Sequence, residues 1–134
     1  MYNAIKTSVS GLMAATQKAK VAASNIANAQ VVSSPQSSVG NLADARGYIP
    51  QRVEQTTNKN GGVKSTILPV NPASLSLYDP SSPLSSQEGF VHIPNVSLAA
   101  ESAELIRASQ SYKANAKVLK ILDESQKSLL DALK

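Results

Sequence analysis

The chain contains no cysteine and no tryptophan, and its aromatic side chains are limited to four tyrosines and one phenylalanine among 134 residues. Without cysteine it can form neither disulfides nor thiolate nucleophiles, and the usual cysteine-ligated zinc sites are excluded. With so few aromatic side chains, any core must be thin and built from Leu, Ile, Val and Ala. These absences favour an elongated molecule over an ordinary globule.

Long apolar runs and clusters of charge are also missing. No segment approaches the roughly 18 consecutive apolar residues of a membrane span, and the N-terminus lacks the run of about 7 to 15 apolar residues of a signal peptide. The net charge of +4 is modest and the basic residues are dispersed, unlike the basic patch of a nucleic-acid-binding protein. We therefore expect no membrane span and no nucleic-acid partner.

The sequence offers no catalytic constellation. The single histidine, His92, lies in a short apolar run without a plausible partner, which favours a structural or exposed role. Glu101 and Glu104 fall near the start of a predicted helix, where the helix dipole favours acids. Gly61 and Gly62 precede strand-like residues and not the helix of a phosphate-binding loop. We expect no enzyme activity, no catalytic or metal-binding residue and no cofactor.

The longest segment free of Pro and Gly, from about Asn95 to Lys134, predicts a helix of roughly 37 residues and about 55 Å. Asn95 or Ser97 can cap its start, and Lys127 and Lys134 suit its end. Its apolar residues recur in two adjacent helical phases, with Asn115 between them. These residues are Leu98, Leu105, Tyr112, Leu119 and Leu133 in one phase, and Ala108, Leu122 and Leu129 in the other.

Residues 3 to about 29 predict a second helix, which Asn3 can cap. Gly11 in its interior costs about 1 kcal/mol relative to Ala, which is tolerable where another backbone comes close. Apolar and small residues form a heptad seam that we expect to pair with the longer helix. The seam consists of Ile5, Val9, Leu12, Thr16, Ala19, Ala23 and Ile26.

Because the C-terminal helix is the longer one, part of its seam is left uncovered. Leu119, Leu122, Leu129 and Leu133 are therefore candidates for contact with other subunits, each contributing about 1.5 to 3 kcal/mol when fully buried. The helical asparagines allow two interpretations. A polar residue in a seam sets register and partner number, but these side chains can equally face solvent. They are Asn25, Asn28 and Asn115.

The middle of the chain differs from its ends in composition and in the secondary structure that it predicts. The Ser-rich segment Gln30–Asn41 predicts an exposed linker. Tyr48–Thr57 and Val63–Leu68 favour strands, and the intervening Asn58–Gly62 tolerates positive φ, so we expect a β-hairpin. Beyond it, five prolines predict an extended segment that lies along a surface and packs onto the hairpin or a neighbour. Its expected packing residues are Tyr78, Pro80, Leu84, Phe90 and Ile93.

The predicted fold is mainly α. The N- and C-terminal helices pair as an elongated coiled-coil domain formed by residues 1–30 and 95–134, and residues 31–94 supply a linker and a small β-hairpin or extended insert.

Two helical segments resemble signatures of a known family. Ala22–Asn28 resembles the N-terminal signature of the flagellar axial proteins, which comprise rod, hook and hook-associated subunits. Tyr112–Leu119 resembles their C-terminal signature. In between, Gly61–Lys64, Tyr78–Leu84 and Gly89–Val96 resemble segments of a member of the proximal rod. The chain is thus similar to the flagellar basal-body rod proteins over most of its length.

The resemblance implies a structural subunit of the proximal rod that polymerises helically through its terminal helices into a hollow drive shaft. This shaft transmits torque and surrounds the export channel. The implied partners are copies of the chain, other rod proteins, the adaptor to the inner-membrane ring and, during secretion, the flagellar type III export apparatus. The implied location is the periplasmic rod, reached without a cleaved signal peptide. The alternative is a soluble helical-hairpin binding module, such as a secretion chaperone that presents a groove to an amphipathic segment.

Overall fold

The computed structural model describes residues 2–35, 47–59 and 61–133. Its elements are α1 (Tyr2–Asn28), β1 (Gln51–Thr57), β2 (Val63–Pro69), β3 (Ser74–Tyr78), β4 (Phe90–Pro94) and α2 (Leu98–Ala132). The prediction of two long terminal helices around a small antiparallel insert is confirmed. Half of the predicted linker Gln30–Asn41, residues 36–41, lies outside the described residues. The division into two regions stays a prediction.

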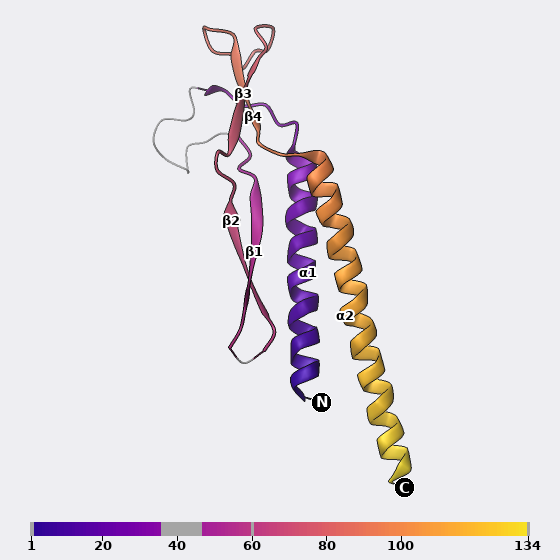
Figure 1. The fold of residues 1–134 in the computed structure, drawn as a ribbon. Coiled ribbons are helices and arrows are strands. Elements are labelled where there is room, and N and C mark those ends of the chain that lie inside the picture. The colour runs from indigo at the N-terminus through magenta and orange to yellow at the C-terminus, as the bar shows by residue number, and fades with distance from the viewer. Residues whose placement is uncertain (1, 36–46, 60, 134) are drawn as a thin grey trace.

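The two helices run side by side in opposite directions, with the β elements beside and beyond them (Figure 1). Two contacts fix the antiparallel alignment: Lys18 reaches Glu104, and Asn25 reaches Glu101. Helix α2 has 35 residues against 27 in α1, an excess of about 12 Å at 1.5 Å per residue. In Figure 1 the C-terminal end of α2 runs past the start of α1, so its last turns have no intramolecular helix beside them.

The face of α1 that is buried differs from the predicted seam. The buried residues are Ser8, Ala14, Ala15, Val21, Ala22 and Asn25. Ser8, Gly11, Ala15 and Ala22 each come one residue before a residue of the predicted seam. The face that they form is therefore rotated about the axis of α1 by about 100° from the predicted seam. Thr16 and Ala23 of the predicted seam are exposed, and the others, Ile5, Val9, Leu12, Ala19 and Ile26, are only half-buried. The predicted seam is therefore not the most buried face of α1, and its role in helix pairing stays a prediction.

Close approach of the helices explains the rotation. A Cβ atom at Gly11 would lie 2.8 Å from both terminal atoms of the Asn115 side chain. Gly11 therefore makes room for this side chain, whereas the sequence predicted the close approach of another backbone. The Asn115 amide donates to the Ser111 carbonyl of its own helix at 2.9 Å. Small residues allow the two helices to interlock in this way, and the larger side chains are displaced to the flanks.

Along α2, Ala108 is the buried residue. Leu105, Asn115, Leu119 and Leu122 are half-buried, whereas Leu98, Tyr112, Leu129 and Leu133 are exposed. The predicted cap is confirmed, since Ser97 accepts a hydrogen bond from the Ala100 amide.

One prediction about the helix ends fails, because Asn3 lies within α1 and does not precede it. Lys127 lies in α2 and pairs with Asp123 one turn earlier. Lys134 lies outside the described residues.

The β1–β2 hairpin is confirmed. Its strands pair antiparallel from Gln51 opposite Pro69 to Thr57 opposite Val63. Gly61 and Gly62 have φ of 81° and 89°, the conformation that favours glycine. The end of the turn is held to α1, because the Val63 amide donates to the Ser10 hydroxyl at 3.1 Å. The hairpin therefore lies along α1.

The proline-rich segment folds into a second two-stranded ribbon, which we did not predict. Strands β3 and β4 pair antiparallel from Ser74 opposite Pro94 to Tyr78 opposite Phe90, and those two rings pack edge to face at 5.4 Å. The prolines leave the ladder intact because they lie in its loops or at its end. Ser33 adds an isolated bridge to His92.

The expected packing residues of this segment are mostly exposed. Tyr78, Pro80, Leu84 and Phe90 face outward and Ile93 is half-buried, while Val91 is fully buried. Packing of the exposed four against the hairpin or a neighbour stays a prediction.

The contact between Gly11 and Asn115 predicts strong non-additivity. In the Asn115→Ala background, Gly11→Ala should raise the free energy of unfolding by about 1 kcal/mol through helix propensity. In the native background the added methyl must displace the Asn115 amide from Ser111, so this gain should vanish. Urea unfolding of the four proteins, followed by circular dichroism, measures the difference. Additive effects within about 0.3 kcal/mol would show that the two side chains do not compete.

Candidate assembly surfaces

Asn25 connects three elements of the fold. Its side chain is fully buried, and its amide nitrogen donates to the Gln51 carbonyl at 2.7 Å and to a Glu101 carboxylate oxygen at 2.8 Å. Its amide oxygen accepts from the Tyr48 hydroxyl at 2.8 Å and from the Gln51 amide at 3.1 Å. These four bonds use both donors of the amide and both acceptor positions. One side chain thus fixes α1, the entry to β1 and the first turn of α2 relative to one another.

The other two helical asparagines bond within their own helices. Asn28 donates to the Ser24 carbonyl, and Asn115 donates to the Ser111 carbonyl while also filling the space at Gly11. Sequence reasoning selected all three residues without distinguishing these roles. A role for any of them between subunits stays a prediction.

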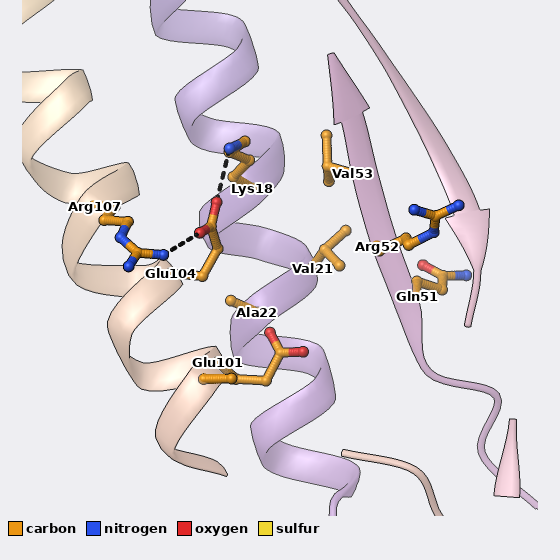
Figure 2. Close-up of a pocket in the computed structure, with 10 residues that line it drawn as sticks. Lys18, Val21, Ala22, Gln51, Arg52, Val53, Glu101, Glu104 and Arg107 are labelled. Atoms are coloured by element: carbon orange, nitrogen blue, oxygen red, sulfur yellow. Dashed lines mark hydrogen bonds and ion pairs between the residues drawn. The ribbon is translucent and has the colours of Figure 1, made fainter. Parts of the chain in front are cut away.

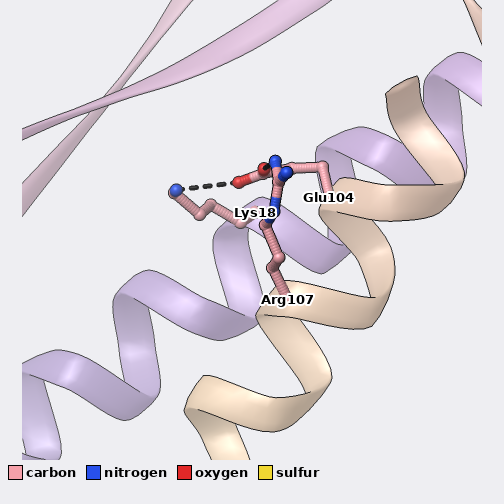
Figure 3. Close-up of polar contacts among 3 residues, drawn as sticks. All are labelled: Lys18, Glu104 and Arg107. Carbon is pink, nitrogen blue, oxygen red and sulfur yellow. Dashed lines mark hydrogen bonds and ion pairs between the residues drawn. The ribbon is translucent and has the colours of Figure 1, made fainter.

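A charged cluster lies between α1 and α2. Glu104 accepts from Lys18 at 2.8 Å and is 3.5 Å from Arg107 (Figure 3). The hydrogen bond from Lys18 and the nearby positive charges hold the pKa of Glu104 below its ordinary value of 4.5, although partial burial opposes the shift. Sequence reasoning attributed Glu104 to the helix dipole alone. Lys18 lies on the same face of α1 as Ala15 and Ala22, so its pairing with Glu104 can be predicted only once this face is known to turn toward α2.

This cluster borders a cleft of about 350 Å³ where α1, α2 and β1 meet. Figure 2 shows Val21 and Val53 lying between α1 and β1, with Glu101 and Glu104 on the α2 side. The cleft therefore combines an apolar floor with carboxylates already engaged by Asn25 and Lys18. Among the described residues no group of three or more metal-ligating side chains is present. No helix in that part of the chain is long and apolar enough to cross a membrane.

Two further surfaces are apolar and open to solvent. On the outer side of α1, a groove of about 490 Å³ is lined by Val9, Leu12, Met13, Thr16, Gln17, Lys20, Ile67 and Tyr112. At the end of α2, Leu129, Leu130 and Leu133 are 52%, 63% and 84% exposed. Much of the predicted α1 seam and the end of the predicted α2 seam therefore lie on the outside of the isolated chain.

These features together define a class of protein. The molecule is elongated, its buried polar groups are structural, and apolar side chains lie along the outsides of its helices. Exposed apolar patches of this kind mark protein–protein contact surfaces. The fold is that of a structural subunit of a larger assembly.

Comparison with known proteins identifies the family. The family described as "Flagella basal body rod protein" matches residues 5–32, and that described as "Flagellar basal body rod FlgEFG protein C-terminal" matches residues 87–132. The flagellar basal-body rod protein FlgC of Yersinia enterocolitica is 35% identical over 120 residues, covering 89% of this chain and 87% of the relative.

FlgC of Buchnera aphidicola subsp. Schizaphis graminum (strain Sg) is 38% identical over 127 residues, covering 90% and 88% of the two chains. FlgC of Aquifex aeolicus (strain VF5) is 26% identical over 134 residues, covering 100% and 98%. The chain belongs to the flagellar basal-body rod protein family, as the two terminal signatures indicated. It is a structural subunit of the flagellar basal-body rod and not an enzyme.

The four hydrogen bonds of Asn25 predict a large loss of stability on substitution. Asn25→Leu keeps a similar volume but removes the bonds to Gln51 and Glu101, while Tyr48 keeps its hydrogen bond to the Ser24 hydroxyl at 3.1 Å. The loss should lower the free energy of unfolding by about 2–4 kcal/mol. Asn28→Ala is the matched control, because its amide donates to the Ser24 carbonyl of its own helix, and should cost less than about 1 kcal/mol. Equal losses in urea unfolding would refute the linking role of Asn25.

The lowered pKa of Glu104 predicts a defined pH dependence. Its contribution to stability is fully present above the ordinary pKa of 4.5 and is lost as the pH falls through the lower pKa of the folded state. Lys18→Met should therefore destabilise the protein at pH 7, and the difference from the native chain should shrink as the pH falls below 4.5. Lys120→Met, which removes an exposed pair 3.8 Å long, should have little effect at any pH. A difference that is constant down to pH 2 would contradict the assignment.

Proposed function

We propose that this chain is a subunit of the proximal part of the rod and that its terminal helices, paired as a coiled coil, polymerise helically into the hollow drive shaft. The observation that carries the proposal is the outward position of apolar helix residues. The outer face of α1 carries Val9, Leu12 and Met13, and the end of α2 carries Leu129 and Leu133. Each such side chain contributes about 1.5 to 3 kcal/mol when a neighbour buries it fully.

The two apolar surfaces differ from each other, which favours an open assembly. A contact between unlike patches is heterologous, and it builds a helical filament when its rotation does not close. Packed helices repeated over many subunits supply the stiffness that a torque-transmitting shaft requires. The surface around the central export channel would then be formed by parts of these stacked subunits.

The interface residues follow from the same reasoning. Exposed residues of the predicted seams, with Val9 and Leu12 of the open groove, are suited to contacts between subunits, and the other half-buried ones to pairing within the chain. The first group is Val9, Leu12, Thr16, Ala23, Leu98, Tyr112, Leu129 and Leu133. Tyr78, Pro80, Leu84 and Phe90 on the β3–β4 ribbon form a further exposed set that suits contact with a neighbouring rod protein.

The remaining proposals rest on the family resemblance. The chain is placed in the periplasmic rod, after secretion by the flagellar type III apparatus without a cleaved signal peptide. Its neighbours are copies of itself, other rod proteins and the adaptor to the inner-membrane ring. The competing function, a secretion chaperone with a helical hairpin, shares the open groove on α1 but requires a stable monomer that binds one client.

Hydrogen exchange on the purified full chain separates these two functions. A rod subunit without its neighbours should exchange the amides at the start of α1 and the end of α2 within seconds to minutes, because the contacts that stabilise them are missing. The amides around Asn25 should be the best protected and serve as the internal control. Strong protection at both termini of the monomer, together with 1:1 binding to a single client, would favour the chaperone.

Removal of the gene tests the rod function in the cell. Cells that lack this chain should assemble no rod beyond the inner-membrane ring and should not swim, and the native gene should restore both. Electron microscopy of basal bodies from the restored cells should place the chain in the proximal rod. Its absence from that map would overturn the proposal.

A further inference from the structure

The β3–β4 ribbon has one outer edge that is bridged and one that is open. On the β4 side, the Ser33 amide donates to the His92 carbonyl and the His92 amide donates to the Ser33 carbonyl, both at 2.9 Å. On the β3 side, β4 is the only strand that pairs with Ser74–Tyr78 among the residues that the structure describes. The ribbon lies beyond the ends of the paired helices (Figure 1). The open edge of β3 is therefore a surface separate from both helices.

The bridge to Ser33 shows which backbone groups of β3 point toward the open edge. Both groups of His92 point away from β3, so its partner Ser76 forms a non-hydrogen-bonded pair and points its own amide and carbonyl away from β4. The alternation along a strand directs the groups of Ser74 and Tyr78 outward in the same way. Among the described residues these outward groups have no hydrogen-bond partner.

The sequence of β3 does not protect this edge against pairing. Proteins commonly protect an open edge with charged side chains, prolines or bulges. The five residues Ser-Leu-Ser-Leu-Tyr contain neither charge nor proline, and their register with β4 runs without a break. Leu75 and Leu77 lie on one face of the strand, and each is 47% exposed. A strand added to the edge would cover these leucines and pair the outward backbone groups.

The strand that fits this edge is β3 of a second copy. In an antiparallel pair centred on Ser76, each Ser76 lies opposite the other, and Ser74 lies opposite Tyr78 of the second copy. All outward backbone groups then fall in hydrogen-bonded pairs. Leu75 falls opposite Leu77 on a shared face, where apolar cross-strand pairs stabilise a sheet. A shift by one residue would place outward groups opposite inward ones, and a shift by two would leave one end of the edge unpaired.

Charge and size are consistent with a weak, closed contact. Asp79, the charged residue next to β3, falls opposite Ala73 of the second copy, so like charges do not meet. Five residues per copy are well below the 20–30 or so per side of a standard stable interface, so the pair forms and dissociates readily. Pairing about a two-fold axis closes on itself and adds no further copy. It cannot be the repeating contact of a rod in which all subunits share one direction.

We propose that free subunits form a two-fold dimer by antiparallel pairing of their β3 edges, which joins the two ribbons into one sheet. The dimer covers Leu75 and Leu77 while the subunit is outside the rod, and it dissociates when the subunit is incorporated. This inference goes beyond the proposed rod function, because it uses a surface and a symmetry that the rod contacts do not use.

A proline at position 76 tests the pairing without breaking the ribbon. Because the Ser76 amide points away from β4, Ser76→Pro removes a donor from the open edge and leaves the β3–β4 ladder bonded. In sedimentation velocity of the full chain, Ser76→Pro should raise the dimer dissociation constant more than tenfold. Ser76→Thr keeps the amide, so it is the matched control and should dimerise as the native chain does.

Two results of this experiment would overturn the inference. One is a native chain that stays monomeric up to its solubility limit. The other is a Ser76→Pro chain that melts as the native chain does in circular dichroism and still dimerises equally well, because the contact would then lie elsewhere.

Cysteine cross-linking tests the register, since the native chain contains no cysteine. Oxidised with copper phenanthroline, Ser76→Cys should link to itself, because hydrogen-bonded partners have Cα atoms about 5.5 Å apart, within the range of a disulfide. Thr56→Cys, on the exposed part of β1, is the control and should link at least tenfold more slowly. A mixture of Leu75→Cys and Leu77→Cys should give more mixed dimer than either self-linked dimer. Preferential linkage of Leu75→Cys to itself would overturn the proposed register.

The dimer and the rod function can fail separately. In cells that lack this gene, Ser76→Pro should restore swimming, because the rod contacts do not require the β3 pair. If this variant melts as the native chain does and yet fails to restore swimming, the assignment of the β3 pair to the free subunit is wrong. If the native gene itself fails to restore swimming, the rod function is wrong, whereas a dimer measured with the purified chain stands.

Discussion

The buried amide of Asn25 is the constraint on which the arrangement of this molecule depends. Its bonds to Tyr48, Gln51 and Glu101 span three elements that are far apart in the sequence. A buried amide with unmet hydrogen bonds is costly, so the helices can take only a rotation that brings these partners together. Once Asn25 faces inward, the heptad spacing also turns Ala22, Ala15 and Gly11 inward, and the whole register of α1 follows.

This rotation determines where the larger apolar side chains lie. Turning the small and polar face of α1 toward α2 lets Gly11 accept the Asn115 side chain and lets Lys18 reach Glu104. It also directs Val9, Leu12 and Met13 outward, where they form the floor of an open groove. Burial of the opposite, more apolar face against α2 would stabilise the isolated chain more. The loss of intramolecular burial is offset if a neighbouring subunit covers the outer face in the rod.

The sequence predicted the elements of the fold better than their rotation. Periodicity located both helices, and the Asn- and Gly-rich turn located the β1–β2 hairpin, because these signals are local. Hydrophobic periodicity did not locate the most buried face of α1, since it identifies the most apolar stripe, and that stripe is only partly buried in the isolated chain. The density of prolines predicts no β3–β4 ribbon, because proline removes a ladder hydrogen bond. The ribbon forms because Pro80 lies in a loop and Pro94 at the end of the ladder. The partners of Asn25 and Glu104 are long-range, and no local pattern shows them.

The thin core has a consequence for the stability of the monomer. Apart from Pro50 and Pro94, the buried apolar side chains among the described residues are Ala14, Ala15, Val21, Ala22, Val91 and Ala108. Alanine removes little apolar area from water, so the hydrophobic contribution is small, and satisfied polar contacts decide which single arrangement is adopted. The exposed leucines of α2 represent a larger contribution that becomes available only when another chain covers them. Folding of the helix ends and assembly are then thermodynamically linked, and the subunit reaches its full stability only within a polymer.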